Sequence, residues 1–330
     1  MSRVTSLTSP LGPCIADYLA LKCALGRKYA VEQKILEHLD AFLNSCTTDL
    51  TAETFMQWCR TREHLTSGVR RTWMRVVRNL CLYRRRTDSD CFVPDPSQFP
   101  LPHQSVRPHI FTETEITRLL TAAGGLQPTA GSPLRSENFR LAIALLYTTG
   151  LRRGELLRLT VGDYDPAQRT LLVRESKFHK SRLLPLSSDP TREVDTYLQI
   201  RRARRLPTAA EAPLIWNRYG GGKAYTGVGF GSTIQALFRA AQIHTAGGGR
   251  PRVHDFRHCF AVHALLRWYR TGADVQAKLP LLATYMGHVS IVSTEYYLRF
   301  VEELAASASE RFDTACGALV TPIPKKEGTS

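Results

Sequence analysis

The stretch TGLRRGEL, residues 149–156, carries the strongest fold signal in this chain, because it sets two arginines beside a glycine. The residues before it, 137–149 (ENFRLAIALLYTT), have apolar positions at helical spacing, and a second short helix is expected at about 153–159. Gly150 separates the two expected helices. Arg152 therefore comes directly after a break between helices.

Four further segments with charged or hydroxyl side chains follow in chain order. They are KFHKSRLLPL at 177–186, HDFRHCFA at 254–261, MGH at 286–288 and TEYY at 294–297. The first overlaps a polar turn between two β-type runs, at 170–174 and 182–186, which predicts a hairpin. In the second, His254 and Arg257 stand at positions i and i+3 and share one face if the segment is helical.

In these five segments the sequence resembles the tyrosine site-specific recombinases, also called the phage-integrase type. The family's T-G-L-R-x-x-E-L box is similar to residues 149–156, and its K-x-x-K-x-R-x-x-P-L hairpin to 177–186. Its H-x-L-R-H-x-F-A box is similar to 254–261, with Phe256 in place of leucine. The L-G-H box is similar to 286–288, with Met286 in place of leucine, and the T-x-x-Y box to 294–297.

The resemblance implies a mainly α fold with a small β-hairpin or sheet, built as a two-domain clamp around duplex DNA. Residues 1–91, whose apolar positions predict about four helices, would be the helical core-binding domain. Five prolines between Phe92 and Pro108 predict an extended linker at 92–110. The tyrosine-recombinase catalytic domain is expected at 111–316, opening with a Thr112–Glu115 capping box, and a flexible tail at 317–330.

The resemblance also implies a catalytic set: Arg152, Lys177, His254, Arg257, His288 and Tyr297. A tyrosine oxygen can attack the scissile phosphate and leave a 3′-phosphotyrosyl bond with a free 5′-hydroxyl. Because that bond keeps the energy of the diester, rejoining needs neither ATP nor a metal, and no cofactor is expected. Arg152 and Arg257, always cationic, would hold the non-bridging oxygens of the phosphate.

The remaining members of the set would handle protons and hydrogen bonds. Lys177 could protonate the leaving 5′-oxygen as a general acid. His254 would accept the tyrosine proton or hydrogen-bond the phosphate, and His288 would donate to the same phosphate. Glu155 is expected to orient arginine or histidine side chains rather than to react.

Three assignments have neighbours that compete with them. Lys180 stands in the same turn as Lys177, and Tyr296 stands directly beside Tyr297. The spacing of the family motif favours Lys177, and the step of nine residues from His288 favours Tyr297. Arg153 replaces the usual apolar or small residue, and it could be a DNA contact or an exposed side chain.

The charge of the chain indicates a nucleic-acid partner. The formal net charge is +15, and residues 60–86 hold nine arginines against one acid, Glu63. Arg70, Arg71, Arg75 and Arg78 recur at near-helical spacing, which predicts a basic helix face that contacts DNA phosphates. A solvated basic face and a membrane-binding helix are the competing interpretations. A second basic cluster is Arg201, Arg202, Arg204 and Arg205, and the glycine-rich residues 217–232 predict a turn-rich insertion.

Cysteine usage points to a reducing compartment. The eight cysteines include no CxxC pair, and the first 25 residues lack the basic head and long apolar stretch of a secretory signal. Reduced thiols and the cytoplasm are therefore expected, without membrane insertion.

The expected function is a DNA recombinase or integrase, specific for a DNA site and encoded by a mobile element. It would act as a homotetramer on two double-stranded DNA sites, with a related recombinase or accessory DNA-bending proteins as possible partners. A type IB topoisomerase and a non-catalytic DNA-binding partner of a related recombinase are the alternatives. The residues do not name the DNA target, because phosphate contacts carry no sequence information directly. Nor do they separate integration from excision, resolution or transposition.

Overall fold

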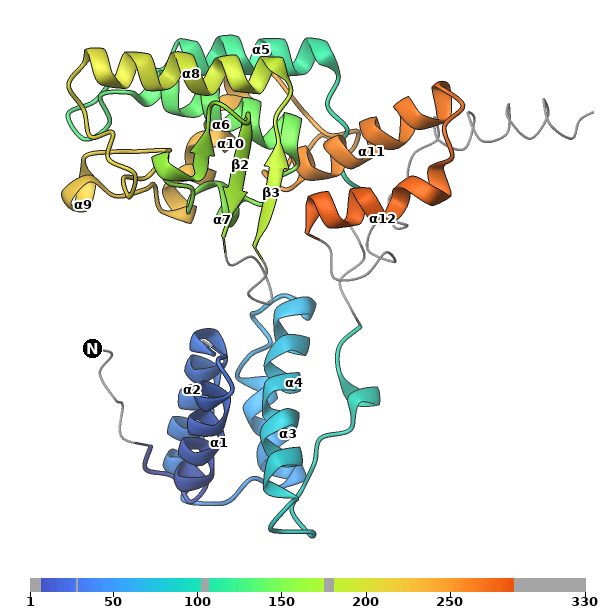
Figure 1. Ribbon diagram of the computed structural model, residues 1–330. Coiled ribbons are helices and arrows are strands. Elements are labelled where there is room, and N and C mark those ends of the chain that lie inside the picture. The colour runs from blue at the N-terminus through green and yellow to red at the C-terminus, as the bar shows by residue number, and fades with distance from the viewer. Residues whose placement is uncertain (1–6, 28, 102–106, 175–180, 288–330) are drawn as a thin grey trace, which may run out of the picture. The chain divides into compact units, whose positions relative to one another are not determined.

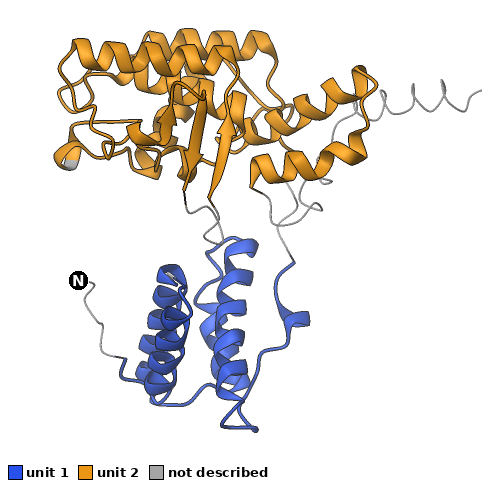
Figure 2. Cartoon of the chain, viewed as in Figure 1, with its two compact units in different colours: residues 1–106 blue, residues 107–330 orange. Residues whose placement is uncertain are grey.

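The computed structural model describes residues 7–27, 29–101, 107–174 and 181–287 (Figure 1). The chain divides into two compact units, residues 1–106 and 107–330 (Figure 2). Both are built mainly from helices, and the second also holds a small antiparallel sheet. The predicted fold class is confirmed. Within the described ranges no helix is both long and apolar enough to cross a membrane.

The described residues of unit 1 form a bundle of four helices, as the apolar spacing predicted. They are α1 (Gly12–Ala24), α2 (Ala30–Cys46), α3 (Ala52–Arg60) and α4 (Ser67–Arg84). The helices bury their apolar stripes in one core. Side chains with no exposed surface include Leu36 and Leu39 of α2, Trp58 of α3, and Val77 and Leu80 of α4.

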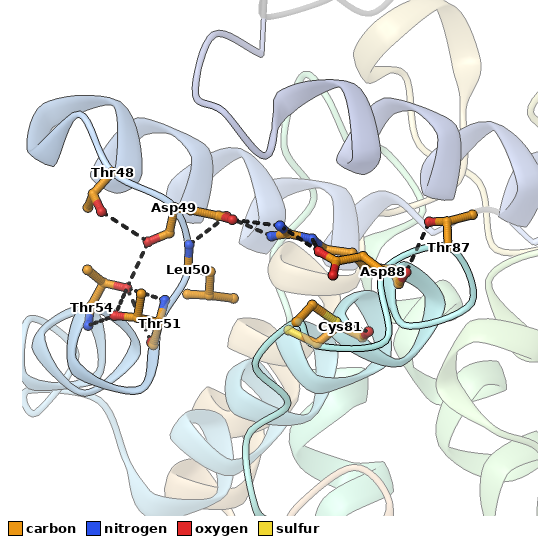
Figure 3. A network of polar contacts seen from close by, with 10 residues as sticks. Thr48, Asp49, Leu50, Thr51, Thr54, Cys81, Thr87 and Asp88 are labelled. Atoms are coloured by element: carbon orange, nitrogen blue, oxygen red, sulfur yellow. Dashed lines mark hydrogen bonds and ion pairs between the residues drawn. The ribbon is translucent and has the colours of Figure 1, made fainter.

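A polar network ties the end of α4 to the connection between α2 and α3 (Figure 3). Arg84 donates from Nη1 and Nη2 to the two carboxylate oxygens of Asp49, at 2.7 and 2.6 Å, and from Nε to Asp88 at 3.0 Å. Asp49 also accepts from the backbone of Leu50. The network joins segments that are distant in sequence by charge-assisted hydrogen bonds.

The proline-rich segment packs against unit 1 over its first part. Phe99 is buried in the unit 1 core, and a short 3₁₀ turn forms at Pro96–Gln98. Nη1 of Arg71 donates to the carbonyl of Pro100 at 2.8 Å, and Nη1 of Arg78 to that of Pro94 at 2.5 Å. Two of the four arginines predicted to contact DNA thus hold this segment. The unit boundary falls within the expected linker, and the domain limits stay predictions.

Unit 2 packs around one central helix. Its elements are α5 (Glu113–Gly124), α6 (Arg135–Thr149), α7 (Arg153–Leu156), the 3₁₀ turn η2 (Val161–Asp163), β1 (Tyr164–Asp165), β2 (Thr170–Val173), β3 (Arg182–Pro185), α8 (Ser188–Ala203), α9 (Tyr219–Gly222), α10 (Gly227–Ala240), α11 (Asp255–Arg270) and α12 (Val275–Met286). Helix α6 contacts α5, α8 and α11. Phe139, Ile143 and Leu146 of α6 are fully buried. The capping box of Thr112 and Glu115 starts α5 as predicted.

The predicted hairpin is present and has one more strand. The sheet order is β1-β2-β3, all antiparallel, with Leu171 opposite Leu184 in the β2–β3 pair. Leu171, Val173 and Leu184 are buried, so one face of the pleat packs on the core. Strand β1 has two residues and was not predicted, because so short a run shows no alternation.

One prediction on unit 2 is wrong. The glycine-rich residues 217–232 were expected to be a turn-rich insertion, yet α10 begins at Gly227, with the Thr226 hydroxyl accepting from the Gly229 amide. Burial of Phe230 outweighs the low helix propensity of glycine. The four arginines of the second basic cluster differ in burial, since Arg202, Arg204 and Arg205 are exposed. Arg201 is fully buried over the Trp216 ring, and Arg204 pairs with Glu137.

Candidate active site

Two helix ends supply backbone carbonyls to the site. Gly150 ends α6 with φ +61°, and Gly287 ends α12 with φ +68°, a left-handed conformation that favours glycine. A Cβ on Gly150 would also lie 2.6 Å from the ring of Phe260. These turns leave the carbonyls of Gly150, Met286 and Gly287 free of the helices and available to side-chain donors.

Arg257 joins the two helix ends from α11. Its side chain is 1% exposed, and Nη1 donates to the Gly150 carbonyl while Nη2 donates to the Met286 carbonyl, both at 2.7 Å. Arginine suits this position because its planar fork presents donors in fixed directions. The guanidinium is therefore set in place by backbone groups.

Arg152 lies beside the same helix ends. Nη1 donates to Oε1 of Glu155 at 2.8 Å, and Nη2 donates to the Gly287 carbonyl at 3.1 Å. Its side chain is 28% exposed, so it keeps an open side. Arg153 goes elsewhere, since its guanidinium lies against Gly227 and Gly231 of α10. Of the two adjacent arginines, Arg152 is the one that shares the site with Arg257.

Glu155 connects Arg152 to a second arginine, Arg182 of β3. Nη1 and Nη2 of Arg182 donate to the two oxygens of Glu155 at 3.3 and 2.9 Å, and Nε donates to the Tyr285 carbonyl at 2.8 Å. Burial alone would raise the pKa of Glu155, but hydrogen bonds from Arg182 and from the Arg152 amide lower that pKa to about 2. The expectation that Glu155 orients arginine side chains is confirmed.

His254 stands at the start of α11, three residues before Arg257. Although its side chain keeps contact with solvent, the protein removes part of the water around the ring, which lowers its pKa from 6.5. The positive charges of Arg257 and Arg152 lower the pKa further. Its ring meets the ring of His258 edge to face, with centroids 4.8 Å apart. Burial lowers the pKa of His258 further, to about 4. Both imidazoles are therefore neutral at pH 7.

The structure thus brings Arg152, His254 and Arg257 into one site. Lys177, His288 and Tyr297, with the competing Lys180 and Tyr296, lie outside the described residues. Arg182 was not singled out from the sequence. The signal that could have found it is its place in the 177–186 segment, where it is the only arginine.

Gly287→Ala tests how closely the helix ends are packed around these arginines. The new Cβ would lie 2.7 Å from Nη1 of Arg182, and the left-handed backbone costs about 1–2 kcal/mol for a residue other than glycine. We expect a lower unfolding free energy and weakened DNA cleavage. Gly272→Ala is the matched control, because its φ is also +68° but no heavy atom lies within 4 Å of the new Cβ. Equal cleavage by the two variants would contradict the prediction.

The low pKa of His258 predicts acid-sensitive stability. The unfolded chain takes up a proton near pH 6.5, whereas the folded chain takes it up only near pH 4. Stability is therefore lost as the pH falls from 6.5 towards 4, by about 2 kcal/mol at pH 5 relative to pH 7. Urea unfolding at the two pH values measures this loss. His258→Gln should flatten the difference, and an unchanged difference would rule out His258 as its source.

The residues match one family over most of unit 2. The model of the phage integrase family matches residues 109–303. This chain belongs to the phage integrase family. The match covers Arg152, His254 and Arg257 and also includes residues 175–180 and 288–303, which the structure does not describe.

Relatives of this integrase-family chain carry recombinase names. It is 30% identical over 302 residues to the putative integrase/recombinase y4rB of Sinorhizobium fredii, covering 91% of this chain and 96% of that protein. It is 34% identical over 193 residues to the tyrosine recombinase XerD of Mycobacterium leprae, covering 58% of this chain and 56% of that protein. The chain is a tyrosine recombinase, an enzyme that cuts and rejoins DNA strands.

Solved structures show the same fold. The Tn1549 transposon integrase in complex with transposon right end DNA superimposes with a TM-score of 0.63 at 16% identity, over 92% of this chain and 98% of that one. The XerH site-specific recombinase bound to a palindromic difH substrate gives a TM-score of 0.60 at 17% identity, over 87% and 78%. At these identities the likeness extends to the fold alone.

Proposed function

We propose that this recombinase moves or resolves the DNA of a mobile element by cutting specific sites with Tyr297. The observation that carries the assignment of the site is the pair Arg152 and Arg257. Buried Arg257 donates to carbonyls at the ends of α6 and α12, and Arg152, which keeps an open side, donates to the Gly287 carbonyl after α12. Two fixed cations beside a neutral histidine suit a phosphodiester whose charge grows during attack.

In the proposed reaction the Tyr297 oxygen bonds to the scissile phosphorus while the bond to the 5′-oxygen breaks. His254, neutral at pH 7, takes the tyrosine proton or hydrogen-bonds the phosphate. Lys177 gives a proton to the leaving 5′-oxygen, and His288 donates to a phosphate oxygen. Arg152 and Arg257 hold the non-bridging oxygens, and hydrogen bonds to Glu155 and to the Gly150 carbonyl orient the two guanidinium groups.

Duplex DNA is the proposed substrate along unit 1 as well. Arg75 of α4 is exposed, and Arg70 is partly exposed. Arg71 and Arg78 each use one donor on the proline-rich segment, so their contribution to phosphate contacts would be smaller. The assignment of all four arginines to DNA stays a prediction.

The assembly and setting of the reaction are proposed from the same family. A homotetramer on two DNA sites, aided by a related recombinase or by DNA-bending proteins, would allow strands to be exchanged between duplexes. The neighbour from Tn1549 is named a transposon integrase, which supports a mobile element as the source. The cytoplasm stays the predicted compartment.

Covalent trapping tests the proposal. The full chain would be incubated in EDTA with nicked duplexes that cover the DNA flanking its own gene, and the products separated on a denaturing gel. A protein–DNA adduct formed without metal supports the proposed cleavage and locates the site. Binding without any adduct on these duplexes or their complements would overturn the assignment of cleavage to this chain alone.

A further inference from the structure

Arg153 is an exposed arginine beside the active site for which the described residues provide no acidic partner. It follows Arg152 directly, so the two Cα atoms are only about 3.8 Å apart. The Arg152 side chain turns to Glu155 and Gly287, whereas that of Arg153 turns to α10. Neighbouring residues thus carry two guanidinium groups to different places near the same helix break.

The Arg153 guanidinium lies against two glycines of α10. A Cβ on Gly231 would lie 3.3 Å from its Nη1, and a Cβ on Gly227 would lie 3.4 Å from its Nη2. A Cβ at Gly231 would require the guanidinium to shift by a few tenths of an ångström, and a Cβ at Gly227 would touch it at van der Waals distance. Neither glycine is needed for a left-handed backbone, since neither has a positive φ. Because the two glycines have no side chains, they leave room for the Arg153 guanidinium.

Among the described residues, the surroundings of Arg153 supply no acid that compensates its charge. Helix α10 has no acidic residue, and its first turn is open, with Val228 84% exposed. The acidic residue of α7, Glu155, already accepts hydrogen bonds from Arg152 and Arg182. An exposed cation without a counter-charge is suited to an anion that arrives with the substrate.

We infer that Arg153 binds a backbone phosphate of the DNA within one or two nucleotides of the scissile phosphate, and that Gly227 and Gly231 position its guanidinium for this contact. The inference rests on the proposed function, because Arg152 must be the residue that holds the scissile phosphate. Arg153 contributes to DNA affinity and to the placement of the strand, and takes no part in bond cleavage.

Salt-dependent DNA binding by the full chain tests the contact. Arg153→Ala should weaken binding about tenfold and lower the slope of log K against log salt by about 0.9, the value for one lost phosphate contact. Arg118→Ala is the matched control: it removes an exposed arginine of α5, which Figure 1 draws at the top of unit 2, above α7. It should leave the slope unchanged.

Substitution of the two glycines provides a second, independent test of the inference. Gly227→Ala combined with Gly231→Ala raises helix propensity, so the thermal stability should not fall. The same change should weaken DNA binding several-fold when Arg153 is present and have no effect in an Arg153→Ala background. Gly247→Ala serves as control, because no heavy atom lies within 4 Å of its new Cβ.

The position of the phosphate can be read directly. Neutral methylphosphonates placed one at a time around the cleavage site should show one position that weakens the wild type but not Arg153→Ala. If the wild type forms adducts while Arg153→Ala keeps the full salt slope, the inference is wrong and the proposed function stands. If the wild type neither binds nor cleaves DNA, both fall.

Discussion

Tyr297→Phe is expected to abolish the covalent adduct completely while DNA affinity stays within about twofold of the wild type. Phenylalanine keeps the ring but lacks the oxygen that must bond to phosphorus, so no alternative path to a phosphotyrosyl bond remains. The variant loses only the contact of one tyrosine hydroxyl with the DNA, so the change in affinity should be small. Adduct formation on nicked duplexes and a gel-shift titration measure the two quantities.

Tyr296→Phe is the control for this assignment. In the helix that the sequence predicts for this segment, adjacent residues would point about 100° apart, so only one of the two hydroxyls would face the phosphate. The step of nine residues from His288 selects Tyr297. Tyr296→Phe should therefore still form the adduct, and the reverse pattern would move the nucleophile to Tyr296.

Glu155→Ala is expected to have the largest effect on stability, a loss of about 3–5 kcal/mol in the unfolding free energy of unit 2. The carboxylate is 2% exposed and accepts from Arg152 and Arg182. Its removal leaves two cations close together without an acid between them. Arg152 then loses its anchor, and cleavage should fall by about 10²-fold or more.

Glu193→Ala is the matched control, because Glu193 pairs with Arg140 through two hydrogen bonds but in a more exposed place. It should cost less than about 1 kcal/mol. The pKa of Glu155, about 2, also fixes the sign of the pH effect: its stabilisation is present above pH 4.5 and is lost as the pH falls towards 2. Equal losses in the two variants would show that burial adds nothing to the Glu155 pair.

The limits of sequence reasoning are clearest for the arginines. Spacing predicted a basic face on α4, and α4 is indeed a helix, but two of its four arginines hold the proline-rich segment. Arg201 belonged to a predicted basic cluster and is fully buried. The spacing of residues in the sequence predicts which face of a helix a side chain occupies. It does not predict the side chain's bonding partner, because that partner belongs to another segment of the chain.

Local pattern also misjudged the glycines of α10. Their low helix propensity predicted turns, but Phe230, Ile234 and Phe238 bury their side chains in unit 2 and stabilise the helix. Residue type alone could not show that the glycine surface would be occupied by the side chain of Arg153.

The sequence by itself determined the family boxes, the mainly helical class, the hairpin and the break at Gly150, because each depends on residue type and spacing along one segment. Only the tertiary structure decided that Arg152 rather than Arg153 joins Arg257, and that Arg182 shares Glu155. These outcomes depend on α6, α7, β3, α11 and α12 meeting in space. Hydrogen bonds that close over 100 residues or more, such as Arg257 to Gly150, leave no periodic trace in the sequence.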